Sequence, residues 1–422
     1  MSHADGPPEL IDHLARCSRR MAVTLRARAV LPMHGPPLDG GWVRIKGGRV
    51  VAVGRRRAAG PTIDLGDVLL LPGLVNPHTH LEFSKIPKPV PPQPPGGLAG
   101  WIPAAVAARR HAARDETAQA ILSGLQESAA AGVTLLGEIA TADPALSYPT
   151  HGVPRLRVFR ECLGLGERRI EQSLASLRRS LDRLPASSAG ISPHAPYSVK
   201  ASLAATLLKL AAKQGLPVVV HLAESREEQD LIEQGTGAFR DLLESIGAWP
   251  SPPPQLLSAA DWVSLACRAP RAAFVHASFL DRPTFDRLVR HRDRAAVIVC
   301  PRTALLISAR IAPVRELLAA GIHVALGTDG RGSAPDLSPL REAQALIDRG
   351  LASPQEALKM MTTSAAWAIG CERIAGRIAC GRPADLVVLR PAEHSTDTYA
   401  DALAPSTQVV MTLRSGRPIH PA

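Results

Sequence analysis

Eight short apolar runs, separated by stretches with helical periodicity, constrain the fold of this chain more than any other feature of its sequence. The intervening stretches, such as residues 201–215 and 226–247, carry apolar residues at spacings of three and four and end near glycine, as amphipathic helices do. This alternation is typical of an α/β fold built as a (β/α)8 barrel, whose functional residues lie at the carboxyl ends of its strands. The eight candidate strands are residues 73–80, 132–138, 155–162, 190–194, 217–223, 272–278, 295–301 and 322–329.

Short β-rich segments flank this region at both ends of the chain. Residues 21–72 contain three strand-like runs, and residues 373–422 contain two more, broken by Gly and Pro. Because each segment is too small to bury its own apolar face, we expect both to join in one composite β-sandwich beside a barrel over residues 73–372. Residues 1–20 lack the apolar segment of a secretory signal, and we expect them to be a disordered extension or to precede the true start.

The composition excludes several classes of protein. Residues are 45% hydrophobic and 21% charged, and no stretch approaches the ~20 uninterrupted apolar residues that a membrane span needs. The six cysteines form no C-x-x-C pair, which indicates a cytoplasmic protein without a disulfide framework. The net charge of +11 suggests nucleic-acid binding, but the basic residues are dispersed and aromatic residues make up only 3%, so we expect no nucleic-acid partner.

A pair of histidines, His78 and His80, ends the first candidate strand. Successive strand side chains point to opposite faces, so these two imidazoles lie on the same side and can reach one cation. His221, His276 and Asp329 fall near the ends of the fifth, sixth and eighth strands, where they face the same mouth of the barrel. Any one of them alone could be a buried structural residue or a helix cap, but the five together favour a metal centre.

The chemistry of these residue types indicates hydrolysis. Imidazole nitrogens and one carboxylate suit Zn²⁺ or Fe²⁺ and leave one position open for water. The cation lowers the pKa of that water from ~15.7 toward 7, Asp329 can take its proton, and His276 can orient the resulting nucleophile. Glu224 follows a strand of this set, where burial would raise its pKa and let it protonate a substrate ring nitrogen. Its alternative role is to stabilise the first turn of the next helix.

In the motifs LPGLVNPHTHLEFS, SPHAPYS, HLAES, VHAS and GTDG, the chain resembles the amidohydrolase superfamily, specifically its single-metal deaminase and chlorohydrolase branch. The motifs are spread over most of residues 20–420. The resemblance implies that His276 lies beside the attacking hydroxide and that Glu224 protonates a heterocycle. Binuclear relatives use a carboxylated lysine on the fourth strand, but residues 190–194 contain none and Lys200 lies beyond the strand end, so we expect one divalent metal, zinc in preference to iron. The implied metal ligands are His78, His80, His221 and Asp329.

Four further residues are candidates for substrate contacts. Glu82 and His194 resemble substrate-gripping residues of the same branch, with a role in shaping a loop as the alternative. Arg160 and Glu161 end the third strand, and at most one of them points into the barrel because adjacent strand residues face opposite ways. The proline-rich residues 87–97 are interpreted either as a loop over the barrel mouth or as a surface excursion without a role.

Two loops depart from the family pattern. The seventh strand continues as CPRTALL where relatives have CPxSN, and the eighth continues as GTDGRGSAP where relatives often have Ser and an Asn-rich turn. Because these loops border the substrate pocket, the departures concern the substrate rather than the metal. His323, at the start of the eighth strand, lies at the opposite end of the barrel and is interpreted as structural.

The resemblance implies a metal-dependent deaminase that releases ammonia from an aminopurine nucleoside or related heterocycle, of the aminodeoxyfutalosine, adenosine or S-adenosylhomocysteine type. A chlorohydrolase or a cyclic amidohydrolase on the same fold is the alternative, although opening an amide does not need the ring protonation that Glu224 offers. A non-catalytic scaffold and a basic nucleic-acid binder are more remote, since every ligand position is filled. We expect a small-molecule substrate, no membrane partner, and a homodimer as is common in this family.

Overall fold

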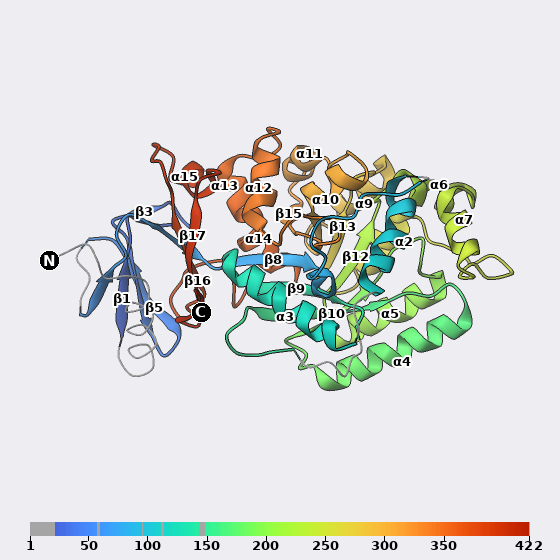
Figure 1. Ribbon diagram of the computed structural model, residues 1–422, viewed down its shortest axis with the longest axis horizontal. Helices are drawn as coiled ribbons and strands as arrows, with labels where there is room; N and C mark the ends of the chain where they lie inside the picture. The colour runs from blue at the N-terminus through green and yellow to red at the C-terminus, as the bar shows by residue number, and fades with distance from the viewer. Residues whose placement is uncertain (1–21, 57–59, 95, 111–113, 143–147, 422) are drawn as a thin grey trace.

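The structure is a computed structural model that describes residues 22–56, 60–94, 96–110, 114–142 and 148–421. The expected extension over residues 1–20 lies outside the described residues. The molecule is elongated, with a helix-covered barrel at one end and strands from both termini at the other (Figure 1). Among the described helices, none combines the length and apolar character required to cross a membrane.

The barrel is one sheet of eight parallel strands whose order in space follows their order in the chain. An isolated bridge between Thr79 and Asp329 joins the last strand to the first, and the amide N–H groups of Thr328 and Asp329 both donate to the His78 carbonyl at 3.2 Å. All eight predicted strands and the (β/α)8 architecture are therefore confirmed. The strands are β8 (Leu74–Thr79), β9 (Val133–Ala140), β10 (Arg155–Cys162), β11 (Ala189–Pro193), β12 (Val218–Leu222), β13 (Ala272–His276), β14 (Ala295–Val299) and β15 (His323–Leu326).

Helices surround this sheet and close one end of it. His323, the first residue of β15, stacks on Trp367 with 3.8 Å between ring centroids, at the end of the barrel that lies away from the strand carboxyl ends, as predicted. The described residues between β9 and β10 form no helix, so the second unit departs from the β/α pattern. The helices of this region are η1 (Leu81–Phe83), α2 (Gly97–Arg110), α3 (Arg114–Ala130), α4 (Glu167–Arg183), α5 (Ala201–Gln214), α6 (Arg226–Gln234), α7 (Ala238–Ser245), α8 (Ala259–Ala266), α9 (Arg282–Arg290), α10 (Pro301–Ile307), α11 (Val314–Ala319), α12 (Pro339–Ile347), α13 (Pro354–Met360) and α14 (Thr363–Ala368).

Two further sheets form the β-sandwich predicted from both termini. One has the order β5-β4-β1-β6, and the other has the order β18-β17-β16-β7-β2-β3, in which β7 and β16 pair antiparallel and join the two ends of the chain. A shared apolar core, with Leu25, Leu70 and Leu413 fully buried, lies between them. Their elements are β1 (Val23–Arg26), β2 (Ala29–Val30), β3 (Leu38–Asp39), β4 (Trp42–Lys46), β5 (Arg49–Gly54), β6 (Thr62–Asp64), β7 (Leu69–Pro72), β16 (Leu386–Arg390), α15 (Thr398–Leu403), β17 (Gln408–Arg414) and β18 (Arg417–His420).

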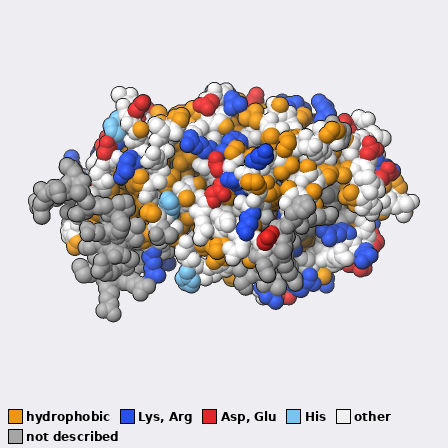
Figure 2. Space-filling model, viewed as in Figure 1, with side chains coloured by type: hydrophobic (Ala, Val, Ile, Leu, Met, Phe, Trp, Pro, Cys, Tyr) orange, Lys and Arg blue, Asp and Glu red, His pale blue; other side chains and the backbone are white. Residues whose placement is uncertain are grey.

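The surface carries the excess of positive charge in dispersed form. Figure 2 shows Lys and Arg side chains interspersed with acidic and apolar ones on one face of the molecule. Several of the described arginines are paired with carboxylates, among them Arg28, Arg155 and Arg302.

Candidate active site

The four histidines and one aspartate predicted as a metal centre meet at the carboxyl ends of the barrel strands. The ring centroid of His78 lies 5.1 Å from that of His80, 4.9 Å from that of His221 and 6.0 Å from that of His276. Asp329 follows β15, and its Oδ1 lies 3.3 Å from His78 Nε2 and 3.6 Å from His80 Nε2. Residues separated by as many as 251 positions therefore surround one point.

The tightest grouping within this cluster contains His276 in place of His80. Ligand atoms of His78, His221, His276 and Asp329 all lie within 4.8 Å of one another. His276 also has a second neighbour, because its Nε2 lies 3.4 Å from Glu224 Oε1. His276 thus connects the candidate metal centre with the candidate proton donor.

Asp329 is held in place from several sides. Its φ is +58°, in the left-handed region that a non-glycine residue adopts only when its surroundings impose it. Its Oδ2 accepts hydrogen bonds from the hydroxyls of Ser333 and Thr303, which lie 2.8 Å from each other, so that Oδ1 is left to face the histidines. Gly327 permits the close approach of the strands, since a Cβ there would lie 2.9 Å from the Cβ of His78.

The protonation states fit a divalent cation. Burial lowers the pKa of His80 to about 3 and that of His276 to about 4, and it also holds the pKa of His221 well below its ordinary value. Burial alone would raise the pKa of Asp329, but the hydrogen bond from His78 and the nearby imidazoles lower it instead. Neutral imidazoles and an ionised carboxylate are the donor set that zinc or iron(II) binds.

Glu224 lies in the turn between β12 and α6, next to the cluster and within the cavity wall. Burial, and secondly the charge of Asp329, raise the pKa of Glu224 well above its usual range, so this carboxyl group keeps its proton to a higher pH than an exposed glutamate does. Ser225 is the N-cap of α6 and its hydroxyl accepts from the Glu228 N–H. Glu224 therefore precedes the helix and does not occupy its first turn.

Glu228, which is not among the residues predicted from the sequence, fixes this turn. Its Oε1 accepts from the Ala223 N–H at 2.9 Å and its Oε2 from the Glu224 N–H at 3.0 Å. Ala223 has a φ of +50°, so the turn is one that an alanine seldom adopts unaided. The Ser-x-x-Glu spacing of Ser225 and Glu228 is a capping-box pattern that indicates a helix start, but it does not indicate this clamp.

A cavity of about 340 Å³ lies over the cluster, and one face of α2 forms its roof. The apolar roof residues are Leu98, Trp101, Ile102, Ala105 and Val106. The described part of the proline-rich segment 87–97 does not line the cavity. It lies beside the loop after β15, where the Val90 N–H donates to the Gly332 carbonyl at 2.8 Å, and it leads into α2. The cover over the barrel mouth is therefore the helix that follows the proline-rich loop.

The carboxylate of Glu82, which was predicted to contact the substrate, is engaged by protein groups in this structure. Its carboxylate is already bound by Arg109 Nη1 at 3.0 Å, by the Thr141 N–H at 2.7 Å and hydroxyl at 2.6 Å, and by the Ala142 N–H at 2.5 Å. Arg109 and Thr141 line the cavity, and Glu82 does not. Glu82 therefore lies behind the cavity wall and holds Arg109 and Thr141 in it, which fits its alternative role of shaping a loop.

The other three candidate contacts divide between two sides of the barrel wall. His194 and Glu161 line the cavity, with His194 Nδ1 2.6 Å from the Ser198 hydroxyl. Arg160 points the opposite way and donates to the Thr141 carbonyl at 3.1 Å and to the Ala142 carbonyl, so its guanidinium is engaged by protein groups and its contact with the substrate stays a prediction. The expectation that only one of the adjacent residues Arg160 and Glu161 faces the barrel interior is confirmed.

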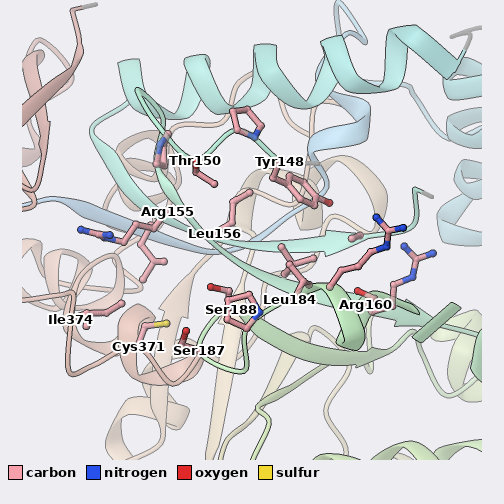
Figure 3. Close-up of a pocket in the computed structure, with 18 of the residues that line it drawn as sticks. Tyr148, Thr150, Arg155, Leu156, Arg160, Leu184, Ser187, Ser188, Cys371 and Ile374 are labelled. Atoms are coloured by element: carbon pink, nitrogen blue, oxygen red, sulfur yellow. The ribbon is translucent and has the colours of Figure 1, made fainter. Parts of the chain in front are cut away.

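A second and larger cavity, of about 730 Å³, lies on the outer side of β10 (Figure 3). Leu156, Val158 and Arg160 of β10 line it, where the second β/α unit has no helix among its described residues. None of the histidines or acids of the cluster lines this space. The smaller cavity is therefore the candidate active site.

The two loops that depart from the family pattern are joined by a partly buried ion cluster. Arg302 donates to both carboxylate oxygens of Asp336 at 2.8 and 2.9 Å and to Glu342 Oε1 at 2.6 Å. Thr303, at the Ser position of the CPxSN pattern, keeps the hydroxyl that reaches Asp329. The substitutions therefore preserve the support of Asp329.

Comparisons with known proteins identify the family of this chain. A model described as the amidohydrolase family matches residues 69–419. The 5-methylthioadenosine/S-adenosylhomocysteine deaminase of Moorella thermoacetica is 26% identical over 390 residues, which cover 87% of this chain and 85% of the relative. Among solved structures, Helicobacter pylori aminofutalosine deaminase in complex with methylthio-coformycin has a TM-score of 0.77 at 22% identity, covering 94% of this chain and 99% of that one. A zinc-bound adenosine deaminase from Xanthomonas campestris has a TM-score of 0.74 at 21% identity, with 94% and 92% covered.

Proposed function

This chain belongs to the amidohydrolase family and is a hydrolase that acts on carbon–nitrogen bonds, and from this we propose that it is a metal-dependent deaminase of aminopurine nucleosides. The proposed substrates are of the kinds named for its relatives: 5-methylthioadenosine, S-adenosylhomocysteine, aminofutalosine or adenosine. One observation carries the proposal. A buried Glu224 lies 3.4 Å from His276, at the wall of a cavity that also exposes Asp329 and His221.

We assign one divalent cation, zinc by preference, to His78, His80, His221 and Asp329. His80 is preferred to His276 as a ligand because His276 Nε2 already lies beside Glu224. Such a cation, when bound, would lower the pKa of a water molecule and so supply the nucleophile.

The protons move through the side chains of this chain. Glu224 donates its proton to the ring nitrogen next to the carbon that bears the amino group, which makes that carbon more electrophilic. Asp329 accepts one proton from the attacking water and passes it to the amino group, which leaves as ammonia. The second proton of the water then leaves the hydroxyl on the ring carbon and returns to Glu224 as that carbon becomes a carbonyl. His276 is 2% exposed and lines the cavity beside Glu224, where it orients the nucleophile.

The cavity fits a nucleoside in size and polarity. A volume of about 340 Å³ is within the usual range of small-molecule sites, roughly 300–1,000 Å³. Trp101 and the other apolar residues of α2 cover the base, and Glu161 and His194 offer polar atoms to hydroxyl groups. Glu224 favours deamination over the opening of a cyclic amide, because amide opening does not require a protonated ring nitrogen.

The test is ammonia release by the metal-loaded enzyme over a panel of aminopurine nucleosides. We expect turnover with at least one member of the panel, and a loss of ~10²-fold or more in Glu224→Gln with metal content unchanged, as removal of a general acid predicts. Glu233→Gln, an exposed acid on α6, is the matched control and should behave as wild type. Full activity in Glu224→Gln, or no ammonia from any of these nucleosides, would overturn the proposal.

A further inference from the structure

The larger cavity, on the outer side of β10, has a wall on which all the charged side chains are cationic. Its described lining residues include four arginines and no aspartate or glutamate. Arg155 and Arg160 come from β10, as Figure 3 shows. Arg183 is the last residue of α4, and Arg414 is the last residue of β17. Three elements from separate parts of the chain therefore bring guanidinium groups to one cavity.

Carboxylates of the protein balance only part of this charge. Arg155 pairs with Asp385, with 3.1 Å between its Nε and the Asp385 Oδ2. Arg160 and Arg414 donate to backbone carbonyls, and within the described ranges neither forms an ion pair. Arg183 is exposed and has no ion-pair partner in those ranges either. The cavity wall thus keeps an excess of positive charge that the described carboxylates do not neutralise.

Burial makes this excess charge costly. Arg160 is only 7% exposed, and its Nε is buried without a hydrogen-bond partner among the described residues. Burial lowers the pKa of Arg160, and burial together with the charge of Arg155 lowers the pKa of Arg414. A buried cation is stabilised when an anion lies beside it. A ligand that brings negative charge into this cavity would therefore be bound favourably.

We propose that this cavity is a binding site for a small organic anion, a molecule that carries a carboxylate or phosphate group on an apolar body. Guanidinium groups bind both kinds of oxyanion through paired hydrogen bonds. Leu156, Val158 and Ile374 offer apolar surface for the body of the ligand. The hydroxyls of Ser187 and Ser188 lie on the same wall as further donors (Figure 3). The volume of about 730 Å³ is within the usual range of small-molecule sites, roughly 300–1,000 Å³.

This site is separate from the candidate active site. The two cavities share no described lining residue, and strand β10 lies between them, with Arg160 on one side and Glu161 on the other. A ligand of the outer cavity therefore does not occupy the space of the substrate. The inference does not depend on the proposed deaminase function.

The experiment is a fluorescence titration of the full chain with 8-anilinonaphthalene-1-sulfonate (ANS), an anion on an apolar body. We expect wild type to bind it, and we expect Arg183→Glu and Ser187→Glu each to weaken binding ~10-fold or more, because each places a negative charge on the cavity wall. Both positions are exposed, so the changes do not disturb the core. The matched control is Arg178→Glu, which makes the same charge change at an exposed position of α4 that does not line the cavity and should bind as wild type does.

Two further measurements make the result specific. A variant with a loosened fold would bind more ANS, since partly folded states expose apolar surface, so weaker binding does not arise from misfolding. Displacement of bound ANS by 1-naphthoate or by 1-naphthyl phosphate distinguishes a carboxylate ligand from a phosphate ligand, and displacement by at least one of them is expected.

Absence of ANS binding to wild type would overturn this inference, as would displacement by neither naphthalene anion. Equal affinity in Arg183→Glu, Ser187→Glu and Arg178→Glu would also overturn it. Binding that Trp101→Ala removes and Arg183→Glu retains would place the probe in the smaller cavity and would contradict the proposed site. Ammonia release is not measured in this experiment, so none of these outcomes bears on the proposed function.

Discussion

Replacing Glu228 by glutamine tests how the turn that carries Glu224 is held. In the wild type, the two carboxylate oxygens accept one hydrogen bond each, from the Ala223 and Glu224 N–H groups. A glutamine side chain offers one oxygen and one NH₂ group in nearly the same volume. In the variant, one of these two backbone N–H groups faces the NH₂ group of the glutamine instead of an acceptor. Water cannot replace the lost acceptor easily, because Glu228 is only 1% exposed.

The magnitude follows from this geometry. A buried donor that loses its hydrogen-bond partner costs ~1–3 kcal/mol. Relaxation of the left-handed Ala223 would recover part of this cost by moving Glu224, so we expect a loss of ~2 kcal/mol of unfolding free energy. A displacement of about 1 Å can lower turnover ~10²-fold, and we expect kcat to fall ~10–100-fold.

The assay combines chemical denaturation, metal content and kcat for ammonia release in Glu228→Gln. Metal content should stay at the wild-type level, because Glu228 contacts none of the proposed ligands. The control is Glu233→Gln in the same helix, which should leave all three measurements unchanged. Wild-type stability together with wild-type kcat in Glu228→Gln would refute the clamp.

Three further predictions concern the same site. Because burial raises the pKa of Glu224, its proton is retained to a higher pH than in an exposed glutamate and is lost as the pH rises further, so kcat should fall on the alkaline side of its profile; a rate that increases steadily with pH would contradict this role. Ser333→Ala removes a hydroxyl bonded to Asp329, and we expect metal affinity to fall ~10–100-fold in competition with a chelator, whereas unchanged affinity would count against that support. Arg302→Gln leaves the carboxylate of Glu342, whose side chain is 0% exposed, without its cation, and denaturation should report a loss of ~3–5 kcal/mol; a loss below about 1 kcal/mol would contradict the ion cluster.

The barrel could be predicted from the sequence because its signals are local. Parallel strands buried on both faces are continuous apolar runs, and residues 217–223 and 272–278 are such runs, so strand number and order followed directly. The carboxyl end of each strand then placed His221 and His276 at one rim. The same local rule, that adjacent strand residues face opposite ways, separated Glu161 from Arg160.

The interactions that hold the site could not be predicted in this way, because they join residues far apart in the chain. Glu82 is bound by Arg109, 27 residues away on α2, and no local pattern indicates that pair. The hydroxyls of Thr303 and Ser333 meet at Asp329 only after β14 and β15 have paired. The sequence also gave no sign that the connection between β9 and β10 would form no helix in its described residues.

The central claim is that His78, His80, His221 and Asp329 bind one catalytic cation, and anomalous diffraction at the zinc edge tests it most directly. Crystals of the enzyme loaded with one equivalent of zinc should give a single strong peak at the carboxyl ends of β8, β12 and β15, within bonding distance, ~2.0–2.2 Å, of all four side chains. A peak elsewhere in the molecule, or a peak at this place that one of the four side chains does not reach, would contradict the account.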